Sequence, residues 1–327
     1  MLPGRYRLFP SMRAIVADDP VSLDLARPYF EKAIAPSKVK KLISWANQVG
    51  YYQNKRECVS EQFQAVYSAN NYDKVREIKL FSFERREILT ICASAHAFER
   101  QLLEYESLHP YFAMPFLEKR TQYENSYKID MVDLIPRPDD EFAVKTIGQC
   151  ICAYHRAHLA EAGSISARQI AKFSYERQEL NDLLTELVEK ISVGALALEI
   201  PLCFQHGDLS RDNLIYGQCA QKTDFWWIDW EHSGQRLFFY DYFFYILNTA
   251  VYFKDKTALE AYLNGDYDDH LKEYFSQFSV QYAPEYRKDY FLLFAVAFLR
   301  ERVCDKGNLS ALKMYNEFIC KTIFDEE

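Results

Sequence analysis

The segment from His206 to Asn213 reads His-Gly-Asp-Leu-Ser-Arg-Asp-Asn, and it combines side chains that suit phosphoryl transfer. In that reaction a carboxylate orients a hydroxyl nucleophile, while metal ions held by an Asn and a second Asp offset the charge of the moving phosphoryl group. The five-residue step from Asp208 to Asn213 lets the loop turn back, so that both side chains can face one Mg2+ site. A second Asp is present in Trp-Ile-Asp-Trp-Glu, where it is Asp229.

A β-hairpin is expected to connect these groups. Residues 214–216 are typical of a strand, residues 217–223 of a turn and residues 224–228 of a returning strand, which would deliver Asp229 beside the first carboxylate. Taken singly, each polar residue is better explained as a turn residue that bonds its own backbone. Their occurrence together in one order favours a catalytic site.

The same motifs resemble, in their order, the catalytic core of the aminoglycoside phosphotransferase and choline kinase family, whose members are relatives of protein kinases. The resemblance covers residues 204–241, with His-Gly-Asp, then Asn, then Ile-Asp-Trp-Glu, then a further Asp. It implies that Asp208 is the catalytic base and that Asn213 and Asp229 hold Mg2+. The residues to which it gives a structural role, fixing the loop by hydrogen bonds, are His206 and Asp241.

A lysine for the nucleotide phosphates is expected on an upstream strand. Lys79 lies among apolar neighbours in Arg-Glu-Ile-Lys-Leu, which places its ammonium on a defined face of a strand. Such a lysine can reach the α and β phosphates when a helix carboxylate holds it in place. The resemblance favours Glu99 as that carboxylate, with Glu87 as the competitor. The structural alternative is a solvated Lys79 on an edge strand and an exposed Glu99.

Residues 127–136 resemble the strand and hinge on which enzymes of this family bind adenine. By this resemblance, the backbone N–H and C=O groups from Val132 to Leu134 contact the base, so the identity of the side chains there carries little information.

A helix is expected to follow the hinge, from residue 141 to about residue 159, with Asp139 and Asp140 as its cap. His155 and His158 fall on its apolar stripe. With no partner acid or cysteine nearby in the sequence, packed or hydrogen-bonded histidines are favoured over metal ligands.

The order of the expected elements indicates the α+β class. Strands at residues 63–67 and 75–81, then a helical stretch over residues 84–108, are typical of the small antiparallel-sheet lobe of a two-lobed, protein-kinase-like fold. Residues 1–36 show no clear period, and residues 37–48 predict an amphipathic helix. The expected domains are an N-terminal extension plus small nucleotide-binding lobe (1–135) and a larger helical lobe with the catalytic loop and substrate site (136–327).

Composition agrees with a globular enzyme and narrows its partners. The 327 residues are 49% hydrophobic and 26% charged, enough for one large core or two lobes. A net charge of -8 argues against nucleic acid as a partner. The apolar stretch at residues 237–253 is short for a membrane span and contains Asp241, so a buried helix is expected. Eight scattered cysteines without a Cys-x-x-Cys pair favour reduced thiols and a cytoplasmic location.

The phosphate loop, expected in residues 51–61, departs from the family pattern. Kinase-like small lobes place a Gly-rich loop there because backbone N–H groups approach phosphates closely only where side chains are absent. This region has no glycine after Gly50 and contains Glu57 and Glu61. Candidate substitutes for the glycines are Ser60, Lys55 and Arg56.

The sequence therefore predicts a Mg2+-dependent phosphotransferase that moves the γ-phosphoryl group of ATP or GTP to a hydroxyl of a small metabolite. Ile-Asp-Trp-Glu resembles the choline and thiamine kinase members, so Glu231 and nearby aromatic rings can receive a cationic amino alcohol. An aminoglycoside or another sugar is the other acceptor class. The alternative is a catalytically silent kinase-like binding or regulatory module, which the glycine-poor loop favours and the intact set of acidic residues disfavours.

Overall fold

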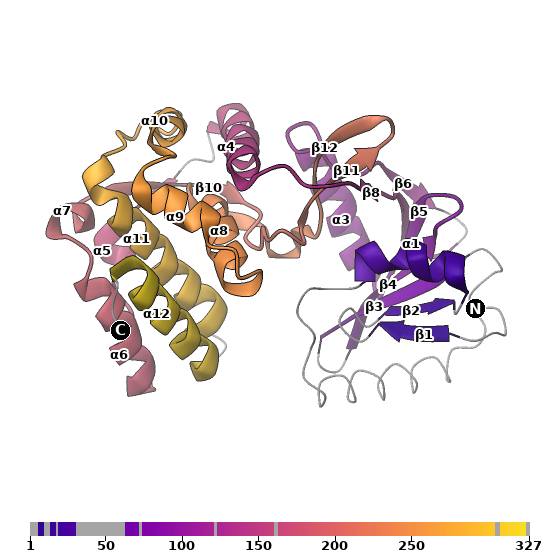
Figure 1. Ribbon diagram of the computed structural model, residues 1–327, viewed down its shortest axis with the longest axis horizontal. Coiled ribbons are helices and arrows are strands. Elements are labelled where there is room, and N and C mark those ends of the chain that lie inside the picture. Colours follow the sequence, from indigo (N-terminus) through magenta and orange to yellow (C-terminus); the bar gives the residue numbers. More distant parts are fainter. Residues whose placement is uncertain are drawn as a thin grey trace. The chain divides into compact units, whose positions relative to one another are not determined.

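The computed structural model describes residues 6–9, 14–17, 19–30, 63–71, 74–120, 123–159, 163–304 and 308–324. The predicted helix at residues 37–48 and the predicted phosphate loop at residues 51–61 lie outside these ranges. The chain divides into two compact units (Figure 1). Unit 1 comprises Met1–Arg137 and Ile215–Ile228, and unit 2 comprises Pro138–Leu214 and Asp229–Glu327. The hairpin at residues 215–228, which the sequence analysis assigned to the second lobe, thus makes its contacts mainly in unit 1.

Unit 1 is built on a seven-stranded antiparallel sheet in the order β1-β2-β3-β4-β5-β7-β6. Its strands are β1 (Tyr6–Phe9), β2 (Ala14–Ala17), β3 (Ala65–Asn71), β4 (Lys74–Ser82), β5 (Glu87–Cys92), β6 (Leu117–Arg120) and β7 (Ser126–Asp130). Two helices pack on it, α1 (Pro20–Phe30) and α3 (Ala95–Leu108). A smaller sheet has the order β12-β11-β8, formed by β8 (Asp133–Leu134), β11 (Leu214–Cys219) and β12 (Lys222–Trp227).

The first part of the predicted helix at residues 84–108 is wrong. Residues 87–92 form β5, a central strand paired with β4 and β7, and only α3 is helical. The segment Glu-Ile-Leu-Thr-Ile-Cys suits a strand because Ile and Thr are β-branched, and Thr90 is fully buried in the sheet. The predicted helix end is confirmed, since α3 ends at Leu108, directly before His109-Pro110.

Residues 1–36 contain regular structure that the sequence pattern did not predict, namely β1, β2 and α1. The buried residues of α1 are Ser22, Ala26 and Phe30, a stripe at four-residue spacing. Val21 and Leu25 of the same helix are exposed, at 68% and 41% of their surface. Apolar residues on both sides of the helix blur its period, which explains why the pattern was missed.

Unit 2 is mainly helical, which together with the sheet of unit 1 confirms the predicted α+β class. Its helices are α4 (Asp140–Ala157), α5 (Ala167–Ile170), α6 (Gln178–Glu189), α7 (Val193–Leu196), α8 (Tyr240–Tyr252), α9 (Thr257–Asn264), α10 (Asp268–Ser276), α11 (Arg287–Leu299) and α12 (Leu309–Phe324). Shorter turns are the 3-10 helices Trp230–His232 and Pro284–Tyr286 and the π-helix Arg300–Cys304. One sheet, in the order β13-β10-β9, contains β9 (Gly163–Ser166), β10 (Glu199–Gln205) and β13 (Gly234–Leu237).

Helix α4 begins and packs as the sequence predicted. The carboxylate of Asp139 accepts a hydrogen bond from the N–H of Phe142 at 2.8 Å, which caps the first turn. His155 is buried with its ring stacked on Phe278, at 4.4 Å between centroids. Burial lowers the pKa of His155 and keeps the ring neutral. The arrangement is that of a packed core histidine.

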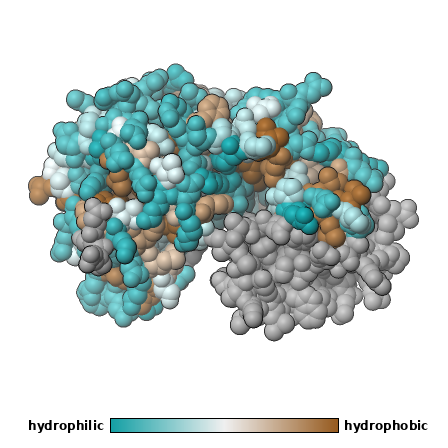
Figure 2. Space-filling view, viewed as in Figure 1, coloured by the Kyte–Doolittle hydropathy of each residue, from teal (hydrophilic) through white to brown (hydrophobic). Residues whose placement is uncertain are grey.

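The core of unit 2 lies around α8 and α11, which are buried on most of their surfaces. Phe243 packs edge-to-face on Phe291 at 5.6 Å, and Tyr240 on Phe294 at 5.3 Å. Helix α8 confirms the buried helix predicted within residues 237–253. Among the described residues, no helix is long and apolar enough to cross a membrane. The visible face of unit 2 is mainly hydrophilic (Figure 2).

Candidate active site

A buried carboxylate fixes the start of the predicted catalytic loop. Asp241, in the first turn of α8, is fully buried and accepts hydrogen bonds from the N–H groups of His206 (2.5 Å) and Gly207 (2.8 Å). The N–H of Asp241 in turn donates to the side-chain oxygen of Gln205 at 2.9 Å. Burial raises the pKa of Asp241 to about 7, against the lowering effect of the two backbone donors and of Arg236. These bonds join the residues to which the resemblance gave a structural role.

Gly207 is required by the path of this loop. Its φ is +79°, a left-handed conformation that side chains with a Cβ rarely adopt. A Cβ added here would lie 2.3 Å from the carbonyl oxygen of His232 and 2.7 Å from the guanidinium of Arg236. The glycine of His-Gly-Asp therefore lets the loop pass closely beside a neighbouring segment.

Asp208 follows the glycine, and its half-buried carboxylate contacts two polar groups. One oxygen lies 2.8 Å from a guanidinium nitrogen of Arg302, and the other lies 3.4 Å from the amide nitrogen of Asn213. Burial raises the pKa of Asp208, the positive charge of Arg302 opposes this rise, and the negative charge of Asp229 adds to it. A carboxylate held in this way can orient a hydroxyl group and accept its proton.

The middle of the loop is fixed by Arg211. Its guanidinium lies 2.6 Å from a carboxylate oxygen of Asp140 at the start of α4 and 2.6 Å from one of Asp255. The hydroxyl of Tyr245 donates to the other oxygen of Asp140 at 2.5 Å. These charge-assisted hydrogen bonds hold the loop between Asp208 and Asn213 to two helices of unit 2. The sequence analysis did not single out Arg211, because its partners are far along the chain.

The predicted hairpin is confirmed in β11 and β12. Its turn is shorter than predicted, with Ala220 and Gln221 at φ values of 47° and 67°. Two successive positive φ values are typical of a two-residue type I′ turn. Two residues beyond β12, Asp229 also has a left-handed backbone, with φ 65° and ψ 62°, and it is exposed.

The predicted metal ligands, Asn213 and Asp229, offer oxygen donors of the kind that Mg2+ prefers. The amide nitrogen of Asn213 donates to the backbone oxygen of Asp208 at 2.8 Å, which directs the amide oxygen away from that carbonyl. In the part of the chain that the structure describes, no group of three or more His, Cys, Asp or Glu side chains is placed to hold a metal. A Mg2+ ion bound by only one or two protein side chains completes its coordination with water and phosphate oxygens.

Arg302 is the functional candidate that the sequence analysis missed. It lies in the π-helix that follows α11, with its side chain 15% exposed. The preceding Glu301 pairs with Arg236 through two hydrogen bonds, one of them 3.0 Å long. Arg236 also makes a cation–π contact, with its guanidinium 5.2 Å from the centroid of the Tyr240 ring. The only sequence signal was the Arg-Glu-Arg triplet that ends a long apolar run.

Glu231, the predicted acceptor-binding residue, is exposed in the short 3-10 helix after Asp229. One of its carboxylate oxygens lies 3.2 Å from Nε2 of His232.

In unit 1, Lys79 lies on β4 and pairs with a carboxylate of its own strand. Its ammonium is 2.9 Å from Oε1 of Glu77, and the side chains are 25% and 13% exposed. The other oxygen of Glu77 accepts a hydrogen bond from Gln101 of α3 at 3.3 Å, and Gln101 also bonds the hydroxyl of Tyr127. Glu99, the predicted partner, is exposed on α3.

Glu87, the other helix candidate of the sequence analysis, lies on β5 instead. Its carboxylate is 2.8 Å from the ammonium of Lys128 on β7, the neighbouring strand.

The predicted hinge connects β7 to β8. Its Leu134 pairs with Gly217 of β11, and a Cβ on that glycine would lie 2.3 Å from the Asp133 carbonyl oxygen. The side chain of Val132 packs with Trp226 of β12 in a small apolar cluster. The backbone oxygen of Val132 accepts a hydrogen bond from the hydroxyl of Tyr29 on α1 at 2.7 Å.

Comparison with known proteins identifies one sequence family and several similar structures. A family model described as the phosphotransferase enzyme family matches residues 83–274. A search of curated protein sequences finds no match.

Three solved structures illustrate the structural similarity, each with a TM-score below 0.5. A thermostable mutant of aminoglycoside phosphotransferase APH(4)-Ia is 11% identical, over 84% of this chain and 97% of that chain, with a TM-score of 0.43. A choline/ethanolamine kinase family protein from Mesorhizobium loti is 9% identical, over 85% and 95%, with a TM-score of 0.42. Choline kinase LicA from Streptococcus pneumoniae is 12% identical, over 83% and 98%, with a TM-score of 0.40.

Proposed function

Because the chain belongs to the phosphotransferase enzyme family, we propose that it moves the γ-phosphoryl group of ATP or GTP to a hydroxyl group of a small metabolite. The observation that carries this proposal is that hydrogen bonds and ion pairs fix the loop around Asp208 in position. Asp241 fixes its start, Arg211 its middle, and Arg302 the carboxylate itself. Fixed polar groups around a reacting hydroxyl lower the cost of reorganisation in the transition state.

Asp208 is the proposed catalytic base, and Asn213 and Asp229 are the proposed Mg2+ ligands. Asp208 orients the acceptor hydroxyl and takes its proton as the bond to phosphorus forms. A bound Mg2+ offsets the negative charge of the phosphates. Asn213 also holds the backbone of Asp208 through its amide nitrogen, so one residue serves both the metal and the base.

The proposed nucleotide contacts come from unit 1. Lys79 binds the α and β phosphates, and the backbone of Val132 and Leu134 binds the base. Two carboxylates are candidates to hold the ammonium of Lys79. Glu99 is the residue that the family resemblance implies, and Glu77 is the residue that lies 2.9 Å from it. We place residues 1–135 with the nucleotide and residues 136–327 with the catalytic loop and the acceptor.

The proposed acceptor is a small hydroxylated molecule, namely an amino alcohol, an aminoglycoside or another sugar. Glu231 supports a cationic acceptor, because an exposed carboxylate two residues from Asp229 attracts an ammonium group. The net charge of -8 argues against nucleic acid. A cytoplasmic location is part of the proposal, since the seven cysteines in the described ranges are all free.

A second candidate function, a catalytically silent kinase-like binding module, is favoured by one observation. The hydroxyl of Tyr29 already donates a hydrogen bond to the backbone oxygen of Val132, one of the groups proposed to bind the nucleotide base. A contact of this kind would compete with a nucleotide base for that oxygen.

The substitution Asp208→Asn tests the proposal directly. It removes the proton acceptor and keeps the shape of the side chain, so we expect kcat to fall by about 10^2- to 10^4-fold. Nucleotide binding, measured by calorimetry with Mg2+ and ATP, should stay near its wild-type value. The control is Asp269→Asn, which changes a fully exposed carboxylate on α10. Unchanged turnover in Asp208→Asn would refute the role of this residue as base.

A further inference from the structure

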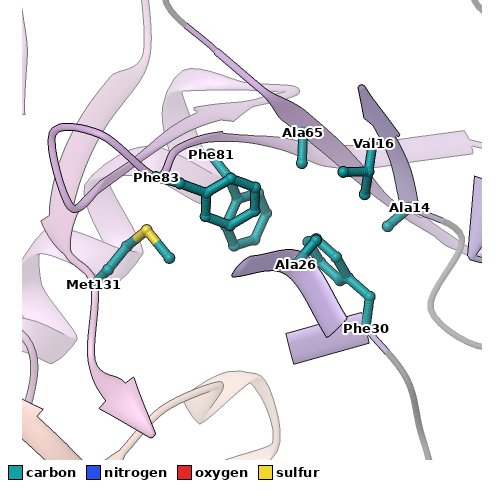
Figure 3. Packing of buried hydrophobic residues seen from close by; sticks show 8 residues of the cluster. All are labelled: Ala14, Val16, Ala26, Phe30, Ala65, Phe81, Phe83 and Met131. Carbon is teal, nitrogen blue, oxygen red and sulfur yellow. The ribbon is translucent and has the colours of Figure 1, made fainter. Parts of the chain in front are cut away.

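Helix α1 covers an apolar face of the unit 1 sheet beside the hinge. Ala26 and Phe30 of α1 are 0% and 2% exposed, and they pack in one cluster with Phe81 of β4 and with Met131. The rings of Phe30 and Phe81 meet edge-to-face at 5.0 Å. Figure 3 shows these side chains in one cluster, with Met131 at its left edge. Met131 directly precedes Val132, so the cluster adjoins the backbone proposed to bind the base.

Tyr29 extends this contact to the hinge itself. Its hydroxyl donates to the backbone oxygen of Val132 at 2.7 Å, and its ring stacks on Phe83 at 6.4 Å between centroids. Burial raises the pKa of the Tyr29 hydroxyl, and the nearby charge of Arg86 opposes the rise. The hydroxyl therefore stays protonated near neutral pH and remains a hydrogen-bond donor to the hinge.

Tyr29 thus presents the same chemistry as a nucleotide base. A purine base is flat and buries apolar faces, and its edge carries N–H groups that donate to a backbone oxygen. Tyr29 offers a flat ring against Phe83 and one donor to Val132, while Phe30 fills the adjoining apolar face. The Val132 oxygen has two lone pairs, and the Tyr29 hydroxyl uses one of them. A base that approached this oxygen along the face of Phe83 would meet the Tyr29 ring, which already stacks there.

We propose that α1 is an autoinhibitory element that occupies the base-binding part of the nucleotide site, so that a nucleotide binds only when α1 leaves the hinge. The inference rests on the proposed function, since it concerns regulation of the same site. In such a protein, the apparent affinity for nucleotide is the intrinsic affinity multiplied by the fraction of molecules in which α1 is released.

The sequence of α1 suits a helix that can be released. It has only 11 residues, a length at which isolated helices are marginal in water. Pro28 lies inside it and lacks the N–H that would complete a hydrogen bond of the last turn. Asp19 caps the other end by accepting from the N–H of Ser22 at 2.9 Å. The helix therefore depends on its docked face more than on its own backbone.

The test compares Mg-ATP affinity in the wild type, Tyr29→Phe and Phe30→Ala by calorimetry. Tyr29→Phe removes only the hydroxyl, and we expect it to bind Mg-ATP roughly two- to tenfold more tightly. Phe30→Ala keeps this hydroxyl but removes the packing of α1 on the sheet, so this variant should also bind Mg-ATP more tightly than the wild type. Leu25→Ala, on the exposed side of the same helix, is the matched control and should bind as the wild type does.

Hydrogen exchange supplies the second measurement, with the full-length wild-type protein. Saturating Mg-ATP should speed exchange of the backbone amides of residues 20–30. Equal affinity in the wild type and Tyr29→Phe, with unchanged exchange in α1, would overturn the inference and leave the proposed function standing. Absence of Mg-ATP binding to every variant, including those with a loosened α1, would overturn both and support the silent module.

Discussion

At the scale of single residues, the pair of Asp208 and Arg302 decides how the proposed base works. The carboxylate must be ionised to accept a proton, but burial raises its pKa. Arg302 stabilises the ionised form from 2.8 Å. The positive charge of Arg302 therefore keeps Asp208 ionised and able to act as a base. Because the Arg302 guanidinium also bonds one carboxylate oxygen of Asp208, it limits the directions from which a hydroxyl can approach that carboxylate.

Removing this charge should move the pH dependence of the reaction. In Arg302→Ala, the pKa of Asp208 rises further, so the base becomes protonated at higher pH than in the wild type. We expect the acid limb of the kcat/KM profile to shift to higher pH, and kcat/KM on that limb to fall by roughly tenfold. Profiles for the wild type, Arg302→Ala and Arg302→Lys would measure the shift. Arg302→Lys keeps a charge and should shift less, whereas identical acid limbs in all three proteins would rule out the electrostatic role.

The sequence could mark candidate site residues where they lie close together along the chain. Asp208, Asn213 and Asp229 lie in two short segments, and the hairpin between them is marked by its own apolar and polar pattern. Arg302 lies 94 residues from its partner and Tyr29 lies 103 residues from Val132. No spacing rule connects residues so far apart, and only the folded chain brings them together.

At the scale of secondary structure, helix α3 reaches Lys79 through an intermediate strand residue. Gln101 of α3 donates to Glu77, and Glu77 pairs with Lys79 on the same face of β4. A strand residue two positions away is held by the backbone of the sheet, so the Glu77 carboxylate sits at a defined position beside the ammonium. The structure thus offers a different carboxylate from the helical Glu99 that the family resemblance implies.

The two carboxylates can be separated by a matched pair of substitutions. Glu77→Gln removes the charge beside Lys79 and should raise the KM for the nucleotide about three- to tenfold, with a smaller effect on kcat. Glu99→Gln changes an exposed residue of the same type on α3 and should leave both constants within about twofold. Steady-state kinetics at varied ATP would measure both. A raised KM in Glu99→Gln alone would restore the helical glutamate as the holder of Lys79.

The errors at this scale have a physical cause. The residues of β5 were assigned to a helix because the charged run Glu-Arg-Arg-Glu preceding them suits a helix start as well as a turn. In the folded unit, the hydrogen bonds of both neighbouring strands fix residues 87–92 as a central strand. Local preference decides an element only when its tertiary contacts agree with it.

At the scale of the whole molecule, the fold class and the order of the sheet and helical units were predictable from the sequence. The secondary structure of the N-terminal segment was not. An antiparallel-sheet unit followed by a helical unit is what the strand and helix patterns indicated. The contribution of α1 was hidden because its burial depends on β2, β4 and the hinge together. In a short helix with apolar residues on two sides, the surface against which it packs decides which side is buried.

The proposed metal-dependent nucleotide site also has a consequence for the stability of the whole chain. A ligand that binds only the folded protein stabilises it by about 2.7 kcal/mol at one hundred times its Kd, which raises the Tm of a chain of this length by about 4 °C. We expect ATP with Mg2+ to raise the wild-type Tm by this order, and ATP without Mg2+ to raise it less. Asp229→Ala should lose the difference between the two conditions, because an oxygen donor of the metal is missing. Asp224→Ala, on the neighbouring strand β12, is the control and should keep it. An unaltered Mg2+ effect in Asp229→Ala would exclude this residue as a ligand and move the metal site to other oxygen donors near Asp208.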